Sequence, residues 1–357
     1  MIKLSFIIPV YNVKQWISVC LDKIYGQGTD EKEFEVICVD DCSPDNSKSI
    51  IKSYQNEHGN LRLIEHTSNK KAGGARNTGL RNAKGEYVWF VDPDDFILDN
   101  AIGIVLDECY NNQLDVLCFN YLIKQNALEF EDSVFKSVSQ VIDGITFLIR
   151  QFGKSIVPNL GYPCRAVYKR QIIVEHNISF FEGILYGEET TFMAEVVIKA
   201  KRVKCIPLSI YCYRQNEQSV SSNLTLHHRG DLIYQSIIVA GNIVYNLQIK
   251  AREQSNELAN CITAGLPWFL NRLFIRLIRT TRIERNRFYL ELKNNKSKTG
   301  LGTVDTLLPY MDKKNRFILT KQVSGRAVLE VLSVSYKVKV FFSTVVTRIT
   351  SFIKRLV

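Results

Sequence analysis

The stretch YVWFVDPDD, residues 87–95, joins a run of five apolar residues to three aspartates that fall within four positions. The apolar run is typical of a buried strand, so the aspartates follow the strand directly. Because like charges repel, three carboxylates this close together need a compensating partner. A divalent cation that prefers oxygen ligands, Mn²⁺ or Mg²⁺, would supply it. A helix-capping turn is the alternative, since aspartates are also common where helices begin.

Around this stretch, short apolar runs alternate with helical patterns over the first 120 residues. We expect a helix through Ile17 and Ile24, and another through Ile50 and Tyr54 that Asp45 or Ser43 caps. The candidate strands are Leu4–Val10, Phe34–Val39, Leu61–Glu65, Tyr87–Val91 and Val116–Asn120. Helices between apolar strands predict an α/β fold whose mostly parallel central sheet is covered by helices.

Polar groups follow the predicted strands, where parallel sheets bind their ligands. They are residues 9–12 (PVYN), 40–43 (DDCS), 69–77 (NKKAGGARN) and 92–95 (DPDD). Because the carboxyl ends of parallel strands meet at one edge, we expect these four groups to converge there. An acidic pair, Glu188 and Glu189, lies farther along the chain.

Charge divides the 357 residues unevenly. Residues 1–200 carry 20 Lys and Arg against 27 Asp and Glu, a net −7, whereas residues 201–357 carry 26 against 9, a net +17. This asymmetry predicts a separate role for the basic part of the chain. A basic surface favours nucleic acid, anionic lipid or an anionic substrate, and charge alone does not choose among them.

The cysteines and the apolar segments indicate a cytoplasmic setting. The nine cysteines include no CxxC pair, which favours reduced thiols. Pro9 interrupts the first apolar run, and no unbroken apolar stretch reaches the roughly eighteen residues of a membrane span. We therefore expect neither a signal peptide nor a transmembrane helix.

The basic segment ends in a stripe of apolar residues at helical spacing over residues 336–357, accompanied by lysines and arginines. Such an amphipathic helix would bind an anionic membrane surface, on the inner face of the cell membrane. The stripe also fits packing against the rest of the chain or against another subunit of an oligomer.

Five stretches, in this order, resemble the family 2 glycosyltransferases. SFIIPVYN (5–12), EVICVDDCSPDNS (35–47) and GGARNTGLRNAKGEYVWFVDPDD (73–95) match the family's motifs in residue type and spacing. FFEGILYGEETTF (180–192) and IYCYRQNEQSVS (210–221) are similar to its acceptor-side and closing segments, so the resemblance covers about residues 2–222.

The resemblance implies a GT-A catalytic domain over residues 1–225. The helical pattern and the excess of Lys and Arg beyond it predict a mainly helical, basic region over residues 226–357. The resemblance also implies an inverting transfer of a sugar from a nucleotide-diphosphate donor. A UDP-sugar is the donor that the family resemblance favours. The acceptor would be a hydroxyl of a glycan or a lipid-linked molecule, in the synthesis of a surface polysaccharide.

For the nucleotide, the resemblance implies contacts from Pro9, Tyr11, Asn12 and Asp41, with Asp41 accepting a hydrogen bond from a ring N–H of the base. Arg76 would contact the base or the phosphates, with the glycines before it allowing a close backbone approach. A loop-packing Tyr11, a turn-forming Asp41 and a solvated Arg76 are the alternatives.

Asp92 and Asp94 match the family's D-x-D motif. The resemblance implies that Asp94 binds the metal directly and that Asp92 contacts the ribose or the hydrated metal. We expect Asp95 to cap the following helix and Asp40 to have a structural role.

The resemblance places the catalytic base at Glu189, beside Glu188, where the family more often has Glu-Asp. Such a base deprotonates the acceptor hydroxyl. The alternative is that both carboxylates only favour the N-terminus of a helix over residues 188–200. Arg214 would clamp the diphosphate or form an ordinary salt bridge, and Glu182 is a second-tier candidate.

Other classes of function have less support. A nicotinamide-dependent oxidoreductase would need a GxGxxG turn, which Gly73 and Gly74 do not supply. Nucleic-acid binding is not expected, because the aromatic residues of the basic region lie on apolar stripes. A non-catalytic nucleotide-sugar-binding protein or membrane-surface scaffold remains the alternative, although it would not need Asp92, Asp94 and Glu189 together.

None of the five histidines shows metal-ligand spacing, so none is given a role.

Overall fold

The structure is a computed structural model that describes residues 1–125, 128–132, 135–154, 163–183, 188–215 and 250–260. The strands are β1 (Leu4–Val10), β2 (Phe34–Asp40), β3 (Leu61–Glu65), β4 (Tyr87–Phe90), β5 (Phe96–Ile97), β6 (Val116–Gln125), β7 (Leu128–Asp132), β8 (Ala166–Lys169) and β9 (Val203–Arg214). The helices are α1 (Ile17–Tyr25), α2 (Ser47–Glu57), α3 (Lys71–Asn82), α4 (Ala101–Asn111), α5 (Gly144–Lys154), the short 3₁₀ helix η1 (Pro163–Arg165), α6 (Arg170–Glu175) and α7 (Glu188–Lys199).

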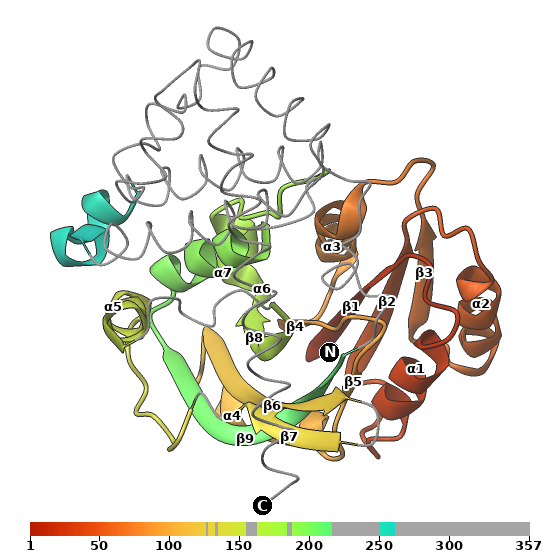
Figure 1. Cartoon of the computed structure of the whole chain (residues 1–357), viewed down its shortest axis with the longest axis horizontal. Coiled ribbons are helices and arrows are strands. Elements are labelled where there is room, and N and C mark those ends of the chain that lie inside the picture. The colour runs from red at the N-terminus through yellow and green to blue at the C-terminus, as the bar shows by residue number, and fades with distance from the viewer. Residues whose placement is uncertain (126–127, 133–134, 155–162, 184–187, 216–249, 261–357) are drawn as a thin grey trace, which may run out of the picture. The chain divides into compact units, whose positions relative to one another are not determined.

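The described strands form one sheet, in the order β3-β2-β1-β4-β8-β6-β9-β5, with β7 paired to β6 (Figure 1). The four strands from β3 to β4 run parallel, with Leu4 opposite both Phe34 and Tyr87. This half of the sheet confirms the predicted parallel arrangement. It also confirms the predicted bounds of β1 and β3, and those of β2 and β4 to within one residue.

The other half of the sheet is mixed. β8 is antiparallel to both β4 and β6, whereas β6 and β9 run parallel from the pair Val116 and Val203 onward. β6 is also longer than predicted, because it continues past Asn120 to Gln125 and pairs there with β7. The central sheet is therefore parallel on the side of β1 and mixed beyond β4.

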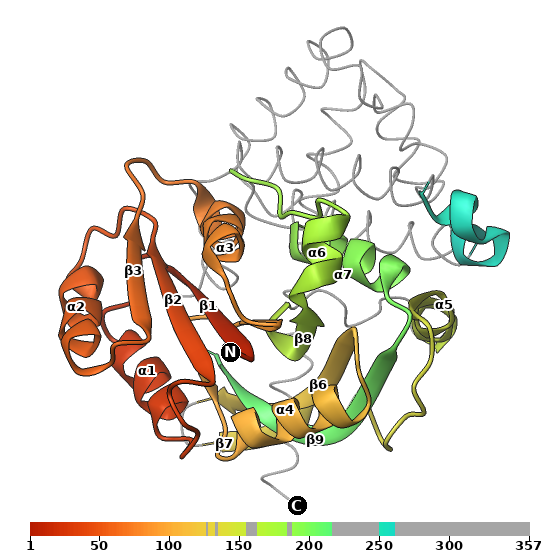
Figure 2. The same ribbon diagram turned by 180° about the vertical axis from the view of Figure 1, so that it is seen from behind.

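Both faces of the parallel half are covered, which explains why its central strands are apolar throughout. Phe6 and Ile8 of β1 join the core formed with α1, α2 and α4. The intervening Ile7 points to the other face, where it meets Gly79 of α3. Figures 1 and 2 show α1 and α2 on one side of these strands and α3 on the other.

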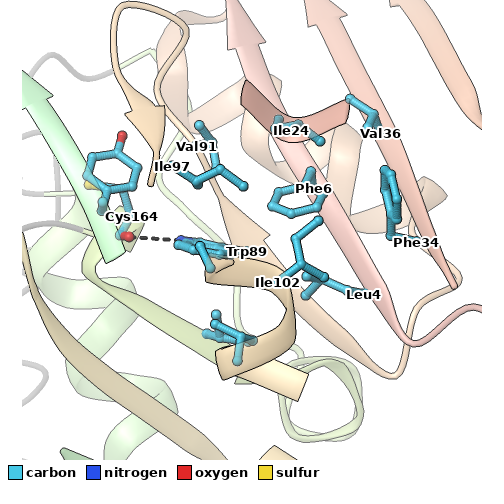
Figure 3. Close-up of a cluster of buried hydrophobic side chains, with 14 of the residues drawn as sticks. Leu4, Phe6, Ile24, Phe34, Val36, Trp89, Val91, Ile97, Ile102 and Cys164 are labelled. Atoms are coloured by element: carbon cyan, nitrogen blue, oxygen red, sulfur yellow. Dashed lines mark hydrogen bonds between the residues drawn. The ribbon is translucent and has the colours of Figure 1, made fainter. Parts of the chain in front are cut away.

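Alternate residues of the apolar run before the aspartates, Tyr87, Trp89 and Val91, belong to this core. Trp89 is fully buried and packs on Phe6 and Phe119. Its indole N–H donates to the Cys164 carbonyl at 2.9 Å, a bond drawn in Figure 3. This bond satisfies the one polar group of the ring and ties β4 to η1. β4 is therefore held rigidly up to the point where the aspartates begin.

Asp45 supports the start of α2, as predicted, but from the residue before the N-cap. The N-cap is Asn46, whose side chain makes no capping bond. The Asp45 carboxylate accepts from the backbone N–H of Ser47 at 3.1 Å and from its hydroxyl at 2.6 Å. It also accepts from the backbone N–H of Lys14 at 2.9 Å, so it joins α2 to the loop after β1.

The eight cysteines within the described residues are free thiols. Of the helices in these same ranges, none has the length and apolarity to cross a bilayer. The predicted boundary at residue 225 and the amphipathic segment 336–357 lie outside the described residues. Of the predicted basic region, the structure describes residues 250–260, in which 250–254 and 256–260 are helical.

The contact between α3 and β1 can be tested at Gly79. A Cβ added there would lie 2.3 Å from the Ile7 Cγ2, and Ile7 is fully buried. We expect Gly79→Ala to lower the free energy of unfolding by about 1–3 kcal/mol through overpacking, although alanine favours a helix by up to about 1 kcal/mol. Urea unfolding followed by circular dichroism measures the change.

Gly59→Ala is the matched control, because nothing lies within 4 Å of the added carbon there. Its free energy of unfolding should stay the same or rise slightly. Equal stability of the Gly79 and Gly59 variants would show that α3 packs more loosely on β1 than the structure indicates.

Candidate active site

The four predicted polar groups meet at the carboxyl edge of the parallel strands. The Asn12 backbone N–H donates to the Ser43 hydroxyl at 3.3 Å, which joins the loops after β1 and β2. The Lys70 backbone N–H donates to Asp41 at 2.7 Å, which joins the loop after β2 to the start of α3. Arg76 of α3 donates to Asp92 after β4 at 2.9 Å. The predicted convergence is confirmed by these bonds.

Arg76 is the centre of the site. Its guanidinium Nη2 lies 2.9 Å from Asp92 Oδ1 and 3.4 Å from Glu189 Oε1, and its Nη1 lies 3.6 Å from Glu188 Oε1. The Arg76 and Glu188 side chains are each 3% exposed, whereas those of Asp92 and Glu189 are 27% and 29% exposed. One buried cation therefore joins Asp92 after β4 to the acidic pair at the start of α7. The alternative of a solvated Arg76 is wrong.

These charges shift the protonation of the cluster. Burial acts to lower the pKa of Arg76, but Asp92, Glu189 and Glu188 outweigh it and raise the pKa overall, so the guanidinium stays charged. Burial, followed by the charge of Glu188, raises the pKa of Glu189 to about 8, although Arg76 acts in the opposite direction. Burial likewise raises the pKa of Glu188. A carboxyl group with a raised pKa is a stronger base than an ordinary glutamate.

Asp95 does not cap a helix, contrary to the prediction. It is 1% exposed, and the next helix, α4, begins later with Asn100 as its N-cap. Its carboxylate accepts from the Tyr211 hydroxyl at 2.7 Å and from the Arg214 backbone N–H at 2.8 Å. The Tyr211 hydroxyl also accepts from the Asp92 backbone N–H at 3.2 Å. Asp95 and Tyr211 thus join the aspartate turn to the end of β9.

The Arg214 side chain contacts the same turn. Its Nε donates to the Asp94 carbonyl at 2.6 Å, and its guanidinium lies over the rings of Trp16 and Phe96 at 4.8 and 5.0 Å from their centroids. In this structure Arg214 supports the backbone of Asp94, and its contact with a diphosphate stays a prediction. Asp94 itself is half-buried.

Asp41 is enclosed by the loop after β3. Its side chain is 3% exposed, and its Oδ1 lies 2.8 Å from Nδ1 of His66 in addition to its bond with the Lys70 N–H. The Asn69 side chain donates to the Asp41 carbonyl at 3.0 Å. His66 received no role from the sequence, and its contact with Asp41 becomes visible only in three dimensions. Asp40 accepts weakly from the Ser43 N–H at 3.3 Å, which fits its expected structural role.

The remaining predicted nucleotide contacts come from the loop after β1. Pro9 is buried in β1 opposite Val39, whereas Tyr11 is 50% exposed. Asn12 adopts a left-handed backbone with φ of 56°, and Cys42 and Lys71 after the next two strands do the same at 61° and 65°. Three strained residues at one sheet edge are typical of a functional site. The exposed ring of Tyr11 argues against a purely packing role.

A segment ahead of α7 packs on α3 beside Arg76. The Asn77 side chain donates to the Phe180 carbonyl at 2.7 Å and accepts from the Phe180 N–H at 2.8 Å. Glu182 is exposed and lies 3.4 Å from the same Asn77 amide. A Cβ at Gly73 would lie 2.3 Å from the Phe181 carbonyl oxygen, so only glycine allows this approach. The sequence did not identify the role of Asn77.

Three comparisons with known proteins bear on this geometry. Residues 5–175 match the family model of glycosyl transferase family 2. The chain is 34% identical over 202 residues to a poly(ribitol-phosphate) beta-glucosyltransferase of Bacillus spizizenii. The aligned region covers 56% of this chain and 30% of that protein. It is 30% identical over 241 residues to the uncharacterized glycosyltransferase YibD of Escherichia coli, which covers 64% of this chain and 65% of that protein. The chain thus spans less than two thirds of either relative.

Among solved structures, the chain resembles the crystal structure of Staphylococcus aureus TarS 1-349 in complex with UDP-GlcNAc. The TM-score is 0.64 at 21% identity, over 94% of this chain and 92% of that chain. At this identity the likeness establishes the fold alone. Residues 5–175 thus match glycosyl transferase family 2, the curated relatives are named glycosyltransferases, and the chain shares the GT-A fold.

Proposed function

We propose that the chain is an inverting glycosyltransferase that moves a sugar from a nucleotide-diphosphate donor, a UDP-sugar, to a hydroxyl of a glycan or lipid-linked acceptor. The observation that carries the proposal is the Arg76 cluster, in which a candidate base and Asp92 of the D-x-D motif share one buried cation. Two relatives, the Bacillus spizizenii enzyme and Staphylococcus aureus TarS, are poly(ribitol-phosphate) glycosyltransferases by name, and TarS 1-349 was crystallised with UDP-GlcNAc. These names favour a role in surface-polymer synthesis.

Glu189 is the proposed base. In the transfer, the acceptor hydroxyl oxygen bonds to the anomeric carbon, its proton passes to a Glu189 carboxylate oxygen, and the bond from the sugar to the diphosphate breaks. The nucleoside diphosphate leaves with the electron pair of that bond. Arg76 supports the proposal because its Nη2 lies against the Glu189 carboxylate and is itself held by Asp92. A base held in this way needs little reorganisation before the proton transfer.

Glu188 has a different proposed role. Its side chain is 3% exposed and lies beside Nη1 of Arg76, whereas Glu189 lies beside Nη2 and is 29% exposed. Glu188 is therefore less accessible to an acceptor than Glu189. Its charge contributes to the raised pKa of Glu189. We propose that Glu188 raises the pKa of Glu189 and orients it through their shared contact with Arg76.

Asp94 and Asp92 are the proposed ligands of Mn²⁺ or Mg²⁺. Burial, followed by the charges of Asp94 and Asp92, raises the pKa of Asp95, so negative charge accumulates at the end of β4 and favours a bound cation. Such a cation would neutralise charge on the diphosphate leaving group. Ligand atoms of Asp92, Asp95 and Cys164 also lie within 4.8 Å of one another. That set fits less well, because both Asp95 oxygens accept hydrogen bonds and a thiol is a soft ligand.

The proposed metal site is tested by nucleotide release from a panel of nucleotide sugars, with and without Mn²⁺. We expect the wild type to release one nucleotide in a metal-dependent way. Asp94→Ala should lower the rate by more than about a hundredfold, because the lost charge stabilisation amounts to several kcal/mol. Asp99→Ala is the control, since Asp99 is exposed and pairs with Lys23 at the surface. Equal release by both variants would exclude Asp94 as a ligand.

The proposed base is tested by Glu189→Gln, which keeps the size of the side chain but cannot take a proton. We expect kcat to fall by about 10²–10⁴-fold while the donor Kd stays the same. Glu195→Gln in the same helix is the matched control, because Glu195 pairs with Lys250 at 3.0 Å, away from Arg76. A loss of donor affinity in place of kcat would argue for a binding role and against the base.

The pH dependence follows from the raised pKa of Glu189. A protonated carboxyl group cannot act as a base, so kcat/KM should increase as the pH rises through the Glu189 pKa. The midpoint should lie above the ordinary value of 4.5 and reach at most about 8. Stopped assays of nucleotide release from pH 5 to pH 9 measure it. A profile that is flat over this range would contradict the assignment.

A further inference from the structure

A chain of hydrogen bonds runs from the surface of α3 to Asp41. Arg81 Nη2 donates to the Thr78 hydroxyl oxygen at 2.9 Å, and that oxygen lies 2.8 Å from Nε2 of His66. The other ring nitrogen of His66, Nδ1, lies 2.8 Å from Asp41 Oδ1. The His66 side chain is 6% exposed and that of Asp41 is 3% exposed. The last two links of the chain are therefore buried, where hydrogen bonds are strong and a missing partner is costly.

The direction of these bonds follows from what each group can donate. The backbone N–H of Lys70 can only donate, so Asp41 Oδ1 acts as an acceptor. A second donor, the Nδ1–H of His66, suits the same carboxylate oxygen. Thr78 accepts from Arg81, which leaves its own hydroxyl hydrogen to donate to Nε2 of His66. Together these partners select the His66 tautomer that carries its proton on Nδ1.

This arrangement leaves one Asp41 oxygen for a ligand. Within the described part of the chain, no hydrogen bond engages Oδ2 of Asp41, although Oδ1 has two donors. His66 and the backbone N–H of Lys70 both bond to Oδ1, so they fix the orientation of the carboxylate. Its remaining oxygen is an acceptor at the edge where the other strand-end groups meet.

The geometry points to His66 as a positioning residue that sets the base preference of the nucleotide site. The inference rests on the proposed function, in which Asp41 meets the nucleobase. With Nδ1–H donating to Asp41, the carboxylate is kept as a hydrogen-bond acceptor. It then favours a base that offers a ring N–H, as uracil does at N3. It disfavours cytosine, which presents an unprotonated acceptor nitrogen at that position. His66 thereby acts through Asp41, with Thr78 fixing its tautomer.

The test compares the Kd of UDP with that of CDP by calorimetry in the presence of Mn²⁺, using the full chain. The wild type should bind UDP more tightly than CDP. His66→Leu removes the donor to Asp41, so UDP should bind about tenfold or more weakly and the ratio of the two Kd values should approach one. His66→Asn places an amide N–H near the position of Nδ1, so it should restore much of the preference for UDP. A defect in folding alone would weaken both nucleotides equally.

His58→Leu is the matched control. His58 lies 2.8 Å from Glu31 through the same ring nitrogen, but Glu31 precedes β2 at the opposite end of the strand. This variant should keep the preference of the wild type. If the wild type binds UDP and His66→Leu keeps the full preference for it, the role of His66 is refuted while the proposed function stands. If the wild type binds no nucleotide, the proposed function fails and the inference fails with it.

Discussion

The burial of the Arg76 guanidinium is the constraint on which the site depends. A charge removed from water is tolerated only beside opposite charges, and removing one partner of such a group is strongly destabilising. Its partners are Asp92 at the end of β4 and the pair Glu188 and Glu189 at the start of α7. These partners lie 16 and more than 100 residues away along the chain. Folding must therefore bring α3, β4 and α7 together to satisfy a single side chain.

The packing of α3 and of β9 around the site also holds Arg76 and its partners in place. α3 can bring Arg76 to the sheet edge only because Gly79 lets it lie directly on Ile7 and Gly73 admits the segment at Phe181. On the other side, Tyr211 and Arg214 hold the aspartate turn, with Asp95 as their shared acceptor. The site is thus built from rigid elements, and the strain of the edge loops is compensated by the core behind them.

The sequence predicted the parallel half of the fold well, because its central strands β1, β2 and β4 are buried throughout and are rich in apolar residues. It did not predict β8, which inserts between β4 and β6, because the pairing of Val88 with Tyr168 leaves no local pattern. Asp95 was assigned to a helix cap for the same reason, since its real partners lie 116 and 119 residues away. Each site residue that was recognised belongs to a sequence motif of the family, whereas His66 is a single histidine in a polar loop and belongs to none of these motifs. Its role depends on Asp41 and Thr78, which only the fold brings to its two nitrogens.

The position of Arg76 gives the proposed mechanism an internal coupling. One guanidinium nitrogen is shared between Asp92, on the proposed donor and metal side, and Glu189, the proposed base. A donor phosphate near this nitrogen would compete with the carboxylates for the same positive charge. Arg76 would then neutralise Glu189 less, so the Glu189 pKa would rise when the donor is bound, and a higher pH would be needed to keep the carboxylate form that accepts a proton. A single buried cation thus gives a physical reason why the protonation of the proposed base should depend on donor binding.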